Sequence, residues 1–499
     1  MSYKIKLADL KRDGAESLTA QLVDRFAAAI DSGQLAPGEK LPPTRALSAE
    51  AGVNHLTAAR VYRRLAELGY VTASVGRGTF VRALAPGAGA EHGDDWQVYA
   101  LPERELSYAQ QVMWDAFDLA DEEGIISLAT GFPSPDAYPV REVAAIAAEV
   151  LAEEGGQALS YLTADGLPSL REQLALRGRR IGFASEPDEI LITSGAQQGI
   201  SLALRAVLEP GDVVVVESPT FAGLLAALRG TDARVIGVPV DGEGFDVAGL
   251  ESILARHEVK LVALQTASHN PTGRDLSAER RSRLAELAIG RNLFVLEDHV
   301  YADLRFEGEA PRPLREVAPA HVLYVNSLSK TVGGGLRLGW IAARGPVRER
   351  IALLKLDADF HTATLIQHIA ARYLASGAYD RHIRRVTPLY RERRDALLAS
   401  LDRHLAGEHR TIPPRGGHHL WVTLTRPIDE RALYSQALRS GVTFTPGGAV
   451  TVERRSQTSL RLSFPRLRPE QLDQGAKLLA GAMREVRRRS RRSVAAPMP

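Results

Sequence analysis

Residues Asn326–Trp340 have the sequence NSLSKTVGGGLRLGW and follow the apolar run His321–Val325. An apolar run that ends in hydroxyls, a lysine and glycines is typical of a buried strand leading into a loop. A lysine in a buried pocket loses its proton more easily, and its neutral amine can attack an aldehyde. Lys330 is therefore predicted to form a Schiff base. The alternative, from this stretch alone, is an exposed lysine at a strand end.

Three side chains near Lys330 in the sequence suit a phosphate group. Ser327 and Ser329 offer hydroxyl donors, and Arg337 offers a guanidinium group that can bind two oxygen atoms at once. A Schiff-base lysine beside such donors indicates pyridoxal phosphate (PLP) as the cofactor.

The composition limits the other function classes. A chain of 499 residues with 45% hydrophobic residues is expected to fold into two or three domains. The net charge of +2 means that any affinity for nucleic acid must come from a local patch. The absence of cysteine excludes disulfides, thiolate metal sites and thiol nucleophiles, and no metal site is predicted. Without a signal-like or membrane-length apolar run, we expect a soluble cytoplasmic protein.

Residues 15–84 are predicted to form the first domain. Apolar spacing predicts helices over 18–32, 44–51 and 55–68, followed by a hairpin of residues 70–73 and 78–81. Three helices and a hairpin make a winged helix-turn-helix, whose recognition helix reads DNA with polar and basic side chains. The candidate DNA-contacting residues are Thr44, Arg45, Asn54, His55, Thr57, Arg60 and Arg77.

Three stretches of this domain resemble the GntR family's DNA-binding domain: LAPGEKLPPTRALSAEAGVN, RVYRRLAELGYV and GRGTFV. The resemblance implies that Thr44 and Arg45 lie against phosphate at a helix start and that the Gly76–Gly78 turn forms the wing. Asn54 and His55 depart from the family's usual serine and arginine, so the operator sequence is not implied. The alternative is a protein-interaction domain with a solvated helix face.

A second domain is predicted over residues 106–488, after a linker over 85–105 rich in alanine, glycine and proline. Strands alternate with helix-length segments, which predicts an α/β fold with a mostly parallel sheet. We expect a large part over about 140–380 and a smaller part over about 385–488. The basic tail, 489–499, is either a solubilising end or an auxiliary DNA contact. The predicted strands are 189–193, 213–217, 234–238, 260–265, 292–297 and 321–325.

Polar residues follow several of these strands, where open α/β sheets bind their ligands. The segment 194–198 opens a helix whose N–H groups can hold a phosphate. PLP acts as an electron sink when its ring nitrogen is protonated, and Asp298 suits that nitrogen. Tyr301 and Asn270 can donate to the ring oxygen, and Phe221 can pack on the ring face. The predicted cofactor residues are Gly195, Ala196, Gln197, Phe221, Asn270, Asp298, Tyr301, Ser327, Ser329, Lys330 and Arg337, of which Lys330, Asp298 and Tyr301 are the catalytic candidates.

The motifs SGAQQ, HNPTG, DHVY, SLSK and GLRLGW resemble those of fold-type I aminotransferases in order and spacing, over roughly residues 106–488. The resemblance implies that Arg461 grips a substrate carboxylate and that Tyr161 reaches the phosphate across a dimer interface. The alternatives are a surface salt bridge for Arg461 and a packed phenol for Tyr161.

A GntR-like domain joined to an aminotransferase-like domain resembles the MocR-type transcription regulators. The resemblance implies a homodimer with PLP on Lys330 and a double-stranded operator with repeated half-sites. The first hypothesis is a regulator that senses PLP or an amino compound through exchange of the Lys330 aldimine. The second is an active aminotransferase with a secondary DNA-binding module, and transamination assays would separate the two. In a third, the cofactor itself is the signal.

Overall fold

The computed structural model describes Leu10 and residues 17–32, 34–36, 38–68, 70–74, 78–81, 108–183, 186–453 and 457–495. The chain divides into two compact units, Met1–Glu105 and Leu106–Pro499. The predicted linker at 85–105 and Arg77 of the predicted wing lie outside the described residues. No helix in the described part of the chain is long and apolar enough to cross a membrane.

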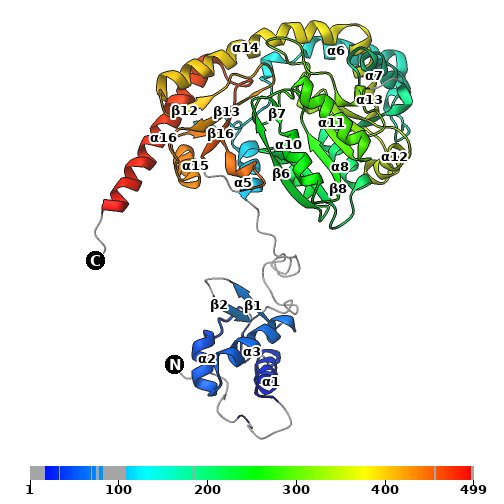
Figure 1. Ribbon diagram of the computed structural model, residues 1–499. Helices are drawn as coiled ribbons and strands as arrows, with labels where there is room; N and C mark the ends of the chain where they lie inside the picture. Colours follow the sequence, from blue (N-terminus) through cyan, green and yellow to red (C-terminus); the bar gives the residue numbers. More distant parts are fainter. Residues whose placement is uncertain are drawn as a thin grey trace. The chain divides into compact units, whose positions relative to one another are not determined.

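The first unit is the predicted winged helix-turn-helix (Figure 1). Ser17 caps the first helix, and the Asn54 side chain caps the third by accepting from the Thr57 N–H at 2.7 Å. The helices bury Phe26 and Val61 among other apolar side chains, each worth about 1.5–3 kcal/mol. Its elements are α1 (Leu18–Asp31), α2 (Thr44–Ala51), α3 (His55–Glu67) and the antiparallel pair β1 (Val71–Ser74) and β2 (Gly78–Val81).

The second unit contains an eight-stranded sheet in the order β4-β11-β10-β9-β8-β5-β6-β7. All six predicted strands are present and run parallel to one another. The sequence prediction missed β11, which inserts antiparallel between β4 and β10. The strands are β4 (Ile190–Thr193), β5 (Val213–Ser218), β6 (Arg234–Asp241), β7 (Gly244–Phe245), β8 (Val259–Leu264), β9 (Phe294–Asp298), β10 (Val322–Ser327) and β11 (Gly339–Ala342).

Helices cover both faces of this sheet because its central strands are apolar on both sides. Val214 and Val216 pack with α8 (Ala196–Val207), α9 (Ala222–Leu228) and α12 (Pro346–Asp359). Val215, between them, faces the other side and packs with α10 (Val247–Leu254) and α11 (Ala278–Gly290). The helices α6 (Val140–Glu154), α7 (Pro168–Ile181) and α13 (Thr364–Ala375) cover the β4 end of the sheet.

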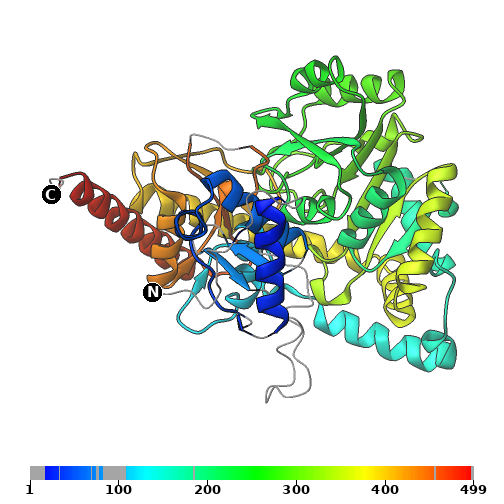
Figure 2. The ribbon, with the colours of Figure 1, turned by 90° about the horizontal axis from the view of Figure 1, so that it is seen from below.

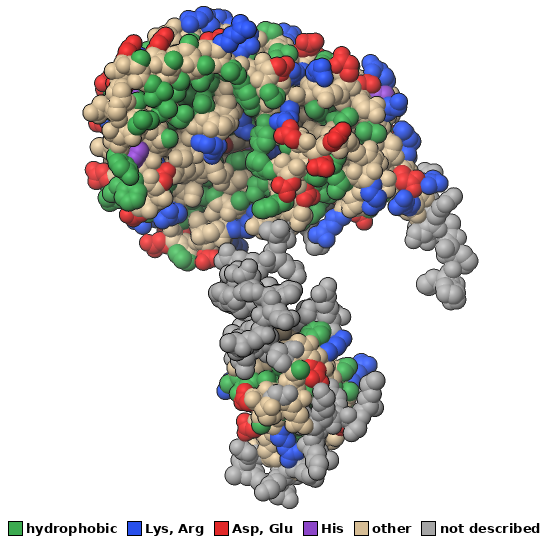
Figure 3. All heavy atoms as spheres, turned by 180° about the vertical axis from the view of Figure 1, so that it is seen from behind, with side chains coloured by type: hydrophobic (Ala, Val, Ile, Leu, Met, Phe, Trp, Pro, Cys, Tyr) green, Lys and Arg blue, Asp and Glu red, His purple; other side chains and the backbone are tan. Residues whose placement is uncertain are grey.

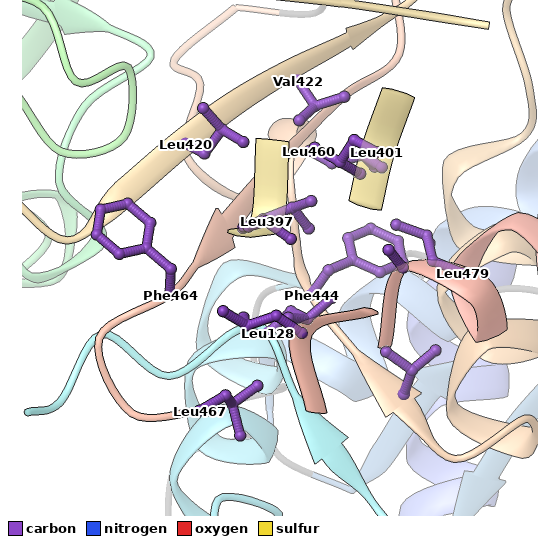
Figure 4. Close-up of a cluster of buried hydrophobic side chains, with 14 of the residues drawn as sticks. Leu128, Leu397, Leu401, Leu420, Val422, Phe444, Leu460, Phe464, Leu467 and Leu479 are labelled. Atoms are coloured by element: carbon purple, nitrogen blue, oxygen red, sulfur yellow. The ribbon is translucent and has the colours of Figure 1, made fainter. Parts of the chain in front are cut away.

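A smaller part packs around an antiparallel sheet of four strands in the order β12-β13-β16-β15. Figure 4 shows its core, where Leu397, Leu420, Phe444, Leu460 and Phe464 point toward one another. Its elements are α14 (Ala378–His404), β12 (His409–Thr411), β13 (His419–Leu424), α15 (Glu430–Arg439), β14 (Val442–Thr443), β15 (Thr445–Pro446), β16 (Ser459–Ser463) and α16 (Pro469–Ala495).

Two boundaries differ from those expected from the sequence. The smaller part also includes the segment before residue 140, because β3 (Ile126–Ser127) pairs with β14 and Leu128 joins its core. A two-residue strand has too few positions to show any period, so no local pattern predicts it. The predicted tail at 489–499 begins inside α16, whose C-terminal turns extend away from the rest of this unit (Figures 1 and 2).

Candidate functional site

The carboxyl ends of the central strands open into a cavity of about 770 Å³ in the second unit. The chain returns to this edge after each parallel strand, which brings residues far apart in sequence into one lining. Gly195 and Tyr161 are the two predicted site residues of this unit that are not part of the lining. The predicted residues that do line it are Ala196, Gln197, Phe221, Asn270, Asp298, Tyr301, Ser327, Ser329, Lys330, Arg337 and Arg461.

Lys330 lies in the turn that joins β10 to β11. Its Nζ is 3.5 Å from the Gly131 carbonyl and 5.9 Å from the centre of the Tyr301 ring. Burial lowers the pKa of Lys330 to about 8, helped by the Arg461 charge and opposed by Asp298. The amine is therefore much easier to deprotonate than that of an exposed lysine.

Asp298 ends β9 and is 7% exposed. Its carboxylate accepts from Gln265 Nε2 at 2.6 Å and from the Val300 N–H at 3.3 Å. Burial raises the pKa of Asp298 to about 6, although the hydrogen bonds from Gln265 and Val300 act to lower it. A cation placed at this carboxylate would be bound favourably, as a protonated ring nitrogen would be.

Gln265 is a site residue that the sequence prediction missed. Besides donating to Asp298, it accepts from the Asn270 N–H at 2.6 Å, so one side chain holds both predicted residues. The available signal was a polar residue directly after the apolar run 259–264, at the ligand-binding edge of the sheet.

A second set of groups in and beside the cavity lining has the chemistry to bind an anion. No side chain caps the N-terminus of α8, and Arg337 Nη2 donates to the Ser194 carbonyl just before it, at 3.0 Å. Ser327 Oγ is 2.8 Å from both Ser329 Oγ and the Leu338 carbonyl, so its single proton serves one of the two, and Ser329 brings a second hydroxyl to the lining. Gly195 has φ +88°, and a side chain there would press on the Arg337 guanidinium. Helix N–H groups, a hydroxyl and a guanidinium together suit a phosphate.

Arg461 comes from β16 in the smaller part. Its Nη atoms donate to Asn270 Oδ1 at 3.1 Å, the Ala129 carbonyl at 2.6 Å and Thr445 Oγ1 at 2.8 Å. Its Nε is buried without a hydrogen-bond partner, and no carboxylate among the described residues pairs with it. Burial lowers the pKa of Arg461 to about 10. An incompletely satisfied guanidinium in a cavity is a ready site for a carboxylate.

Tyr301 Oη lies 2.9 Å from Nε2 of His419, a second residue that the sequence prediction missed. His419 Nδ1 is 2.9 Å from Ser463 Oγ, and burial holds the pKa of His419 well below its usual range. The imidazole is therefore neutral and joins Tyr301 to the strand that carries Arg461. The local signal was the sequence Gly-Gly-His-His, whose last residue, His419, begins β13.

Tyr161 is 88% exposed and packs edge-on to His361, with ring centres 5.4 Å apart. It does not reach the cavity of its own chain, so its predicted role across a dimer interface stays a prediction.

The DNA-contact candidates of the first unit lie on α2 and α3. Arg45, His55 and Arg60 are exposed, whereas Thr44 and Thr57 are half-buried. The Asn54 side-chain oxygen is used by the α3 cap, which leaves its amide N–H₂ for other contacts. Leu56 is 69% exposed beside them and was not predicted. An apolar side chain on a recognition helix can contact a thymine methyl group.

The donor set of the cavity fits PLP. Asp298 suits the ring nitrogen, Tyr301 can donate to the ring oxygen, and Phe221 can pack on the ring face. Lys330 can bind the aldehyde, and the N-terminal end of α8 can bind the phosphate. One group of each required chemical type therefore lines the cavity.

Two family models match this chain. The model for aminotransferase class I and II matches residues 123–479, and that for bacterial regulatory proteins of the gntR family matches residues 18–81. Aromatic-amino-acid aminotransferase 1 of Thermococcus litoralis is 33% identical over 78% of this chain and 95% of its own length. The HTH-type transcriptional regulator TauR of Rhodobacter capsulatus is 29% identical over 97% of this chain and 100% of its own.

Solved structures of aminotransferases resemble about three quarters of this chain. The crystal structure of LysN, an α-aminoadipate aminotransferase from Thermus thermophilus complexed with N-(5'-phosphopyridoxyl)-L-leucine, is 33% identical. It superposes with a TM-score of 0.69 and covers 74% of this chain and 94% of its own. The aminotransferases therefore match about three quarters of the chain, whereas the relative named as a regulator matches nearly all of it.

Proposed function

This chain belongs to the aminotransferase class I and II family and carries a gntR-family DNA-binding unit, and from that premise we propose that it senses an amino compound at Lys330. It is a PLP-dependent transcription regulator of the MocR type. The observation that carries the proposal is Arg461, a guanidinium without a carboxylate partner in the described residues, in the same cavity as Lys330.

Bound PLP supplies an aldehyde that condenses with primary amines. Lys330 would hold this aldehyde, and its lowered pKa favours the neutral amine that such binding requires. Asp298 would hold a protonated ring nitrogen, and Gln265 keeps Asp298 in position through its hydrogen bond. Arg461 would bind the carboxylate of an amino compound in the same cavity and so orient its amine toward Lys330.

The same residues would also serve transamination, so the cavity alone does not favour regulation over catalysis. What favours regulation is the first unit, because TauR matches the chain over both units. Arg45, His55 and Arg60 are proposed to contact a double-stranded operator.

We further propose a homodimer in which Tyr161 of one copy reaches the phosphate site of the other. Large apolar side chains are exposed on the second unit, including Leu353 at 64% and Phe360 at 67%. Figure 3 shows hydrophobic side chains gathered in broad areas on one face of this unit. Such areas commonly mark interfaces. Sedimentation velocity should show a dimer. The variant Tyr161→Phe should retain PLP more weakly than the parent and should remain a dimer.

The test of the proposed function is Lys330→Ala. The purified parent should have a visible absorption band from the bound cofactor, and its operator affinity should respond to amino compounds. Lys330→Ala should lose both the band and the response. Lys260→Ala, which removes an exposed lysine on β8, is the matched control and should keep both. A Lys330→Ala protein with the parent's band would overturn the assignment.

A further inference from the structure

Building on the proposed function, we infer that the cavity takes an amino acid with one carboxylate and an uncharged, apolar side chain. The inference comes from the charges that line the cavity and from the wall opposite them.

The described lining contains three cationic side chains, and each already has a partner in the proposed complex. Lys330 takes the aldehyde, Arg337 lies at the phosphate end, and Arg461 takes one carboxylate. No cation of the described lining is left for a second carboxylate. His419 does not supply one, because burial holds its pKa well below its usual range. Tyr161, proposed to arrive from a second copy, is a phenol.

The lining likewise has no spare carboxylate for a second cationic group on the ligand. Asp298 is the single carboxylate among the described lining residues, and it faces the proposed ring nitrogen. A second ammonium or guanidinium on the ligand would therefore enter the cavity without a carboxylate to pair with.

The remaining wall is largely apolar. The helix α5 (Tyr108–Asp118) contributes Val112, Met113 and Ala116, and the loop after β3 contributes Phe132 and Pro133. A charged group buried against such side chains loses its hydration without gaining a partner, whereas an apolar side chain gains by burial. At about 770 Å³ the cavity lies within the range of pockets that enclose whole small ligands.

The test uses the full-length, PLP-loaded protein and a matched panel of ligands. L-Leucine and L-phenylalanine carry one carboxylate and an apolar side chain; L-glutamate adds a carboxylate, L-lysine adds an amine, and phenethylamine lacks the carboxylate. Half-saturating concentrations are measured from the visible band and, separately, from the shift in operator affinity. Leucine or phenylalanine should half-saturate at concentrations at least tenfold below those of the other three.

A pair of variants tests the wall itself. Met113→Arg places a cation in the cavity and should shift the preference toward glutamate by tenfold or more. Trp114→Arg adds the same charge at the next residue of α5, which is 62% exposed and outside the lining, and should leave the preference unchanged. The visible band of each variant verifies that the site is formed.

The outcomes separate this inference from the proposed function. A preference for glutamate or lysine over both apolar amino acids, or no shift in Met113→Arg, overturns the inference and leaves amino-compound sensing standing. If the protein responds to none of the five ligands, the proposal that it senses amino compounds is wrong. The inference about the ligand's side chain then fails as well, because it depends on that proposal.

Discussion

Lys330 is the residue whose chemistry depends most on its surroundings. Because its pKa is lowered to about 8, about a tenth of the amine is neutral at pH 7, far more than for a lysine of ordinary pKa near 10.4. We predict that the rate at which the cofactor-free protein forms its visible band with added PLP rises about tenfold per pH unit below 8 and levels off above it. Stopped-flow absorbance from pH 6 to 10 measures this rate.

The control for that measurement is Nα-acetyl-lysine, whose reaction should keep accelerating to about pH 10 because its amine has an ordinary pKa. A protein rate that rises to pH 10 in parallel with the model amine would contradict the lowered pKa.

His419 is predicted to be a positioning residue for Tyr301. When Ser463 donates to Nδ1, the neutral imidazole donates from Nε2 to Tyr301 Oη, and the Tyr301 proton is free to donate into the cavity. His419→Phe fills similar space but removes this bond, worth about 1 kcal/mol. Tyr301 then becomes a weaker donor to the ring oxygen. The midpoint pH of the visible band should rise by about half a unit to one unit.

His419→Gln, which can still donate to Tyr301, should restore part of the shift. A purely packing role would give the opposite ranking, since phenylalanine matches the imidazole in shape better than glutamine does. Spectrophotometric pH titration of the three proteins distinguishes the two roles.

At the scale of elements, α3 presents its charged face to solvent while its apolar face joins the core of the first unit. Arg60 is exposed in the middle of this helix, where a recognition helix meets DNA. Arg60→Ala should weaken operator binding by about 1–3 kcal/mol, and its visible band should stay unchanged. Fluorescence anisotropy with a labelled operator at fixed salt measures the loss. Arg291→Ala, an exposed arginine of the second unit, should bind as the parent does.

Elements of the second unit that are distant in sequence build one site. The β10–β11 turn carries Lys330 and Arg337, the end of β9 carries Asp298, and β16 of the smaller part carries Arg461. A ligand that touches both Lys330 and Arg461 therefore binds the large and small parts at once. Such a ligand favours whichever arrangement of the two parts lets it make both contacts.

At the scale of the whole molecule, the response depends on how strongly the ligand prefers one state of the chain. A hundredfold preference corresponds to about 2.7 kcal/mol of coupling. Arg461→Ala should keep the visible band and the operator affinity without ligand, but lose the response to carboxylate-bearing amino acids. Operator titrations with and without ligand measure this. Arg410→Ala, which removes an exposed arginine of β12, is the control and should respond normally.

The variant Arg461→Lys tests whether charge alone is enough. It keeps the positive charge but loses the planar guanidinium that binds both carboxylate oxygens. An intermediate response is expected. If Arg461→Ala responds to the ligand as the parent does, the carboxylate binds elsewhere, and the cofactor-only signal becomes the better hypothesis.

The sequence by itself determined the features that depend on neighbouring residues. The helical spacing of apolar residues and capping residues such as Asn54 indicate the helices of the winged helix-turn-helix. The six apolar runs indicate the parallel strands. The PLP-site candidates Lys330, Asp298 and Asn270 were found because ligand-binding residues follow parallel strands at one edge of the sheet.

Tertiary structure alone decided the features that join distant segments. The insertion of β11 between β4 and β10, the pairing of β3 with β14, and the contact of His419 with Tyr301 each link residues that carry no local signal for one another. The apolar side chains of α5 likewise line the same cavity as Lys330 and Arg461 only in the folded chain. Hydrophobic burial is non-directional, so a local pattern fixes which face is buried, while the packing of the whole chain fixes what that face meets.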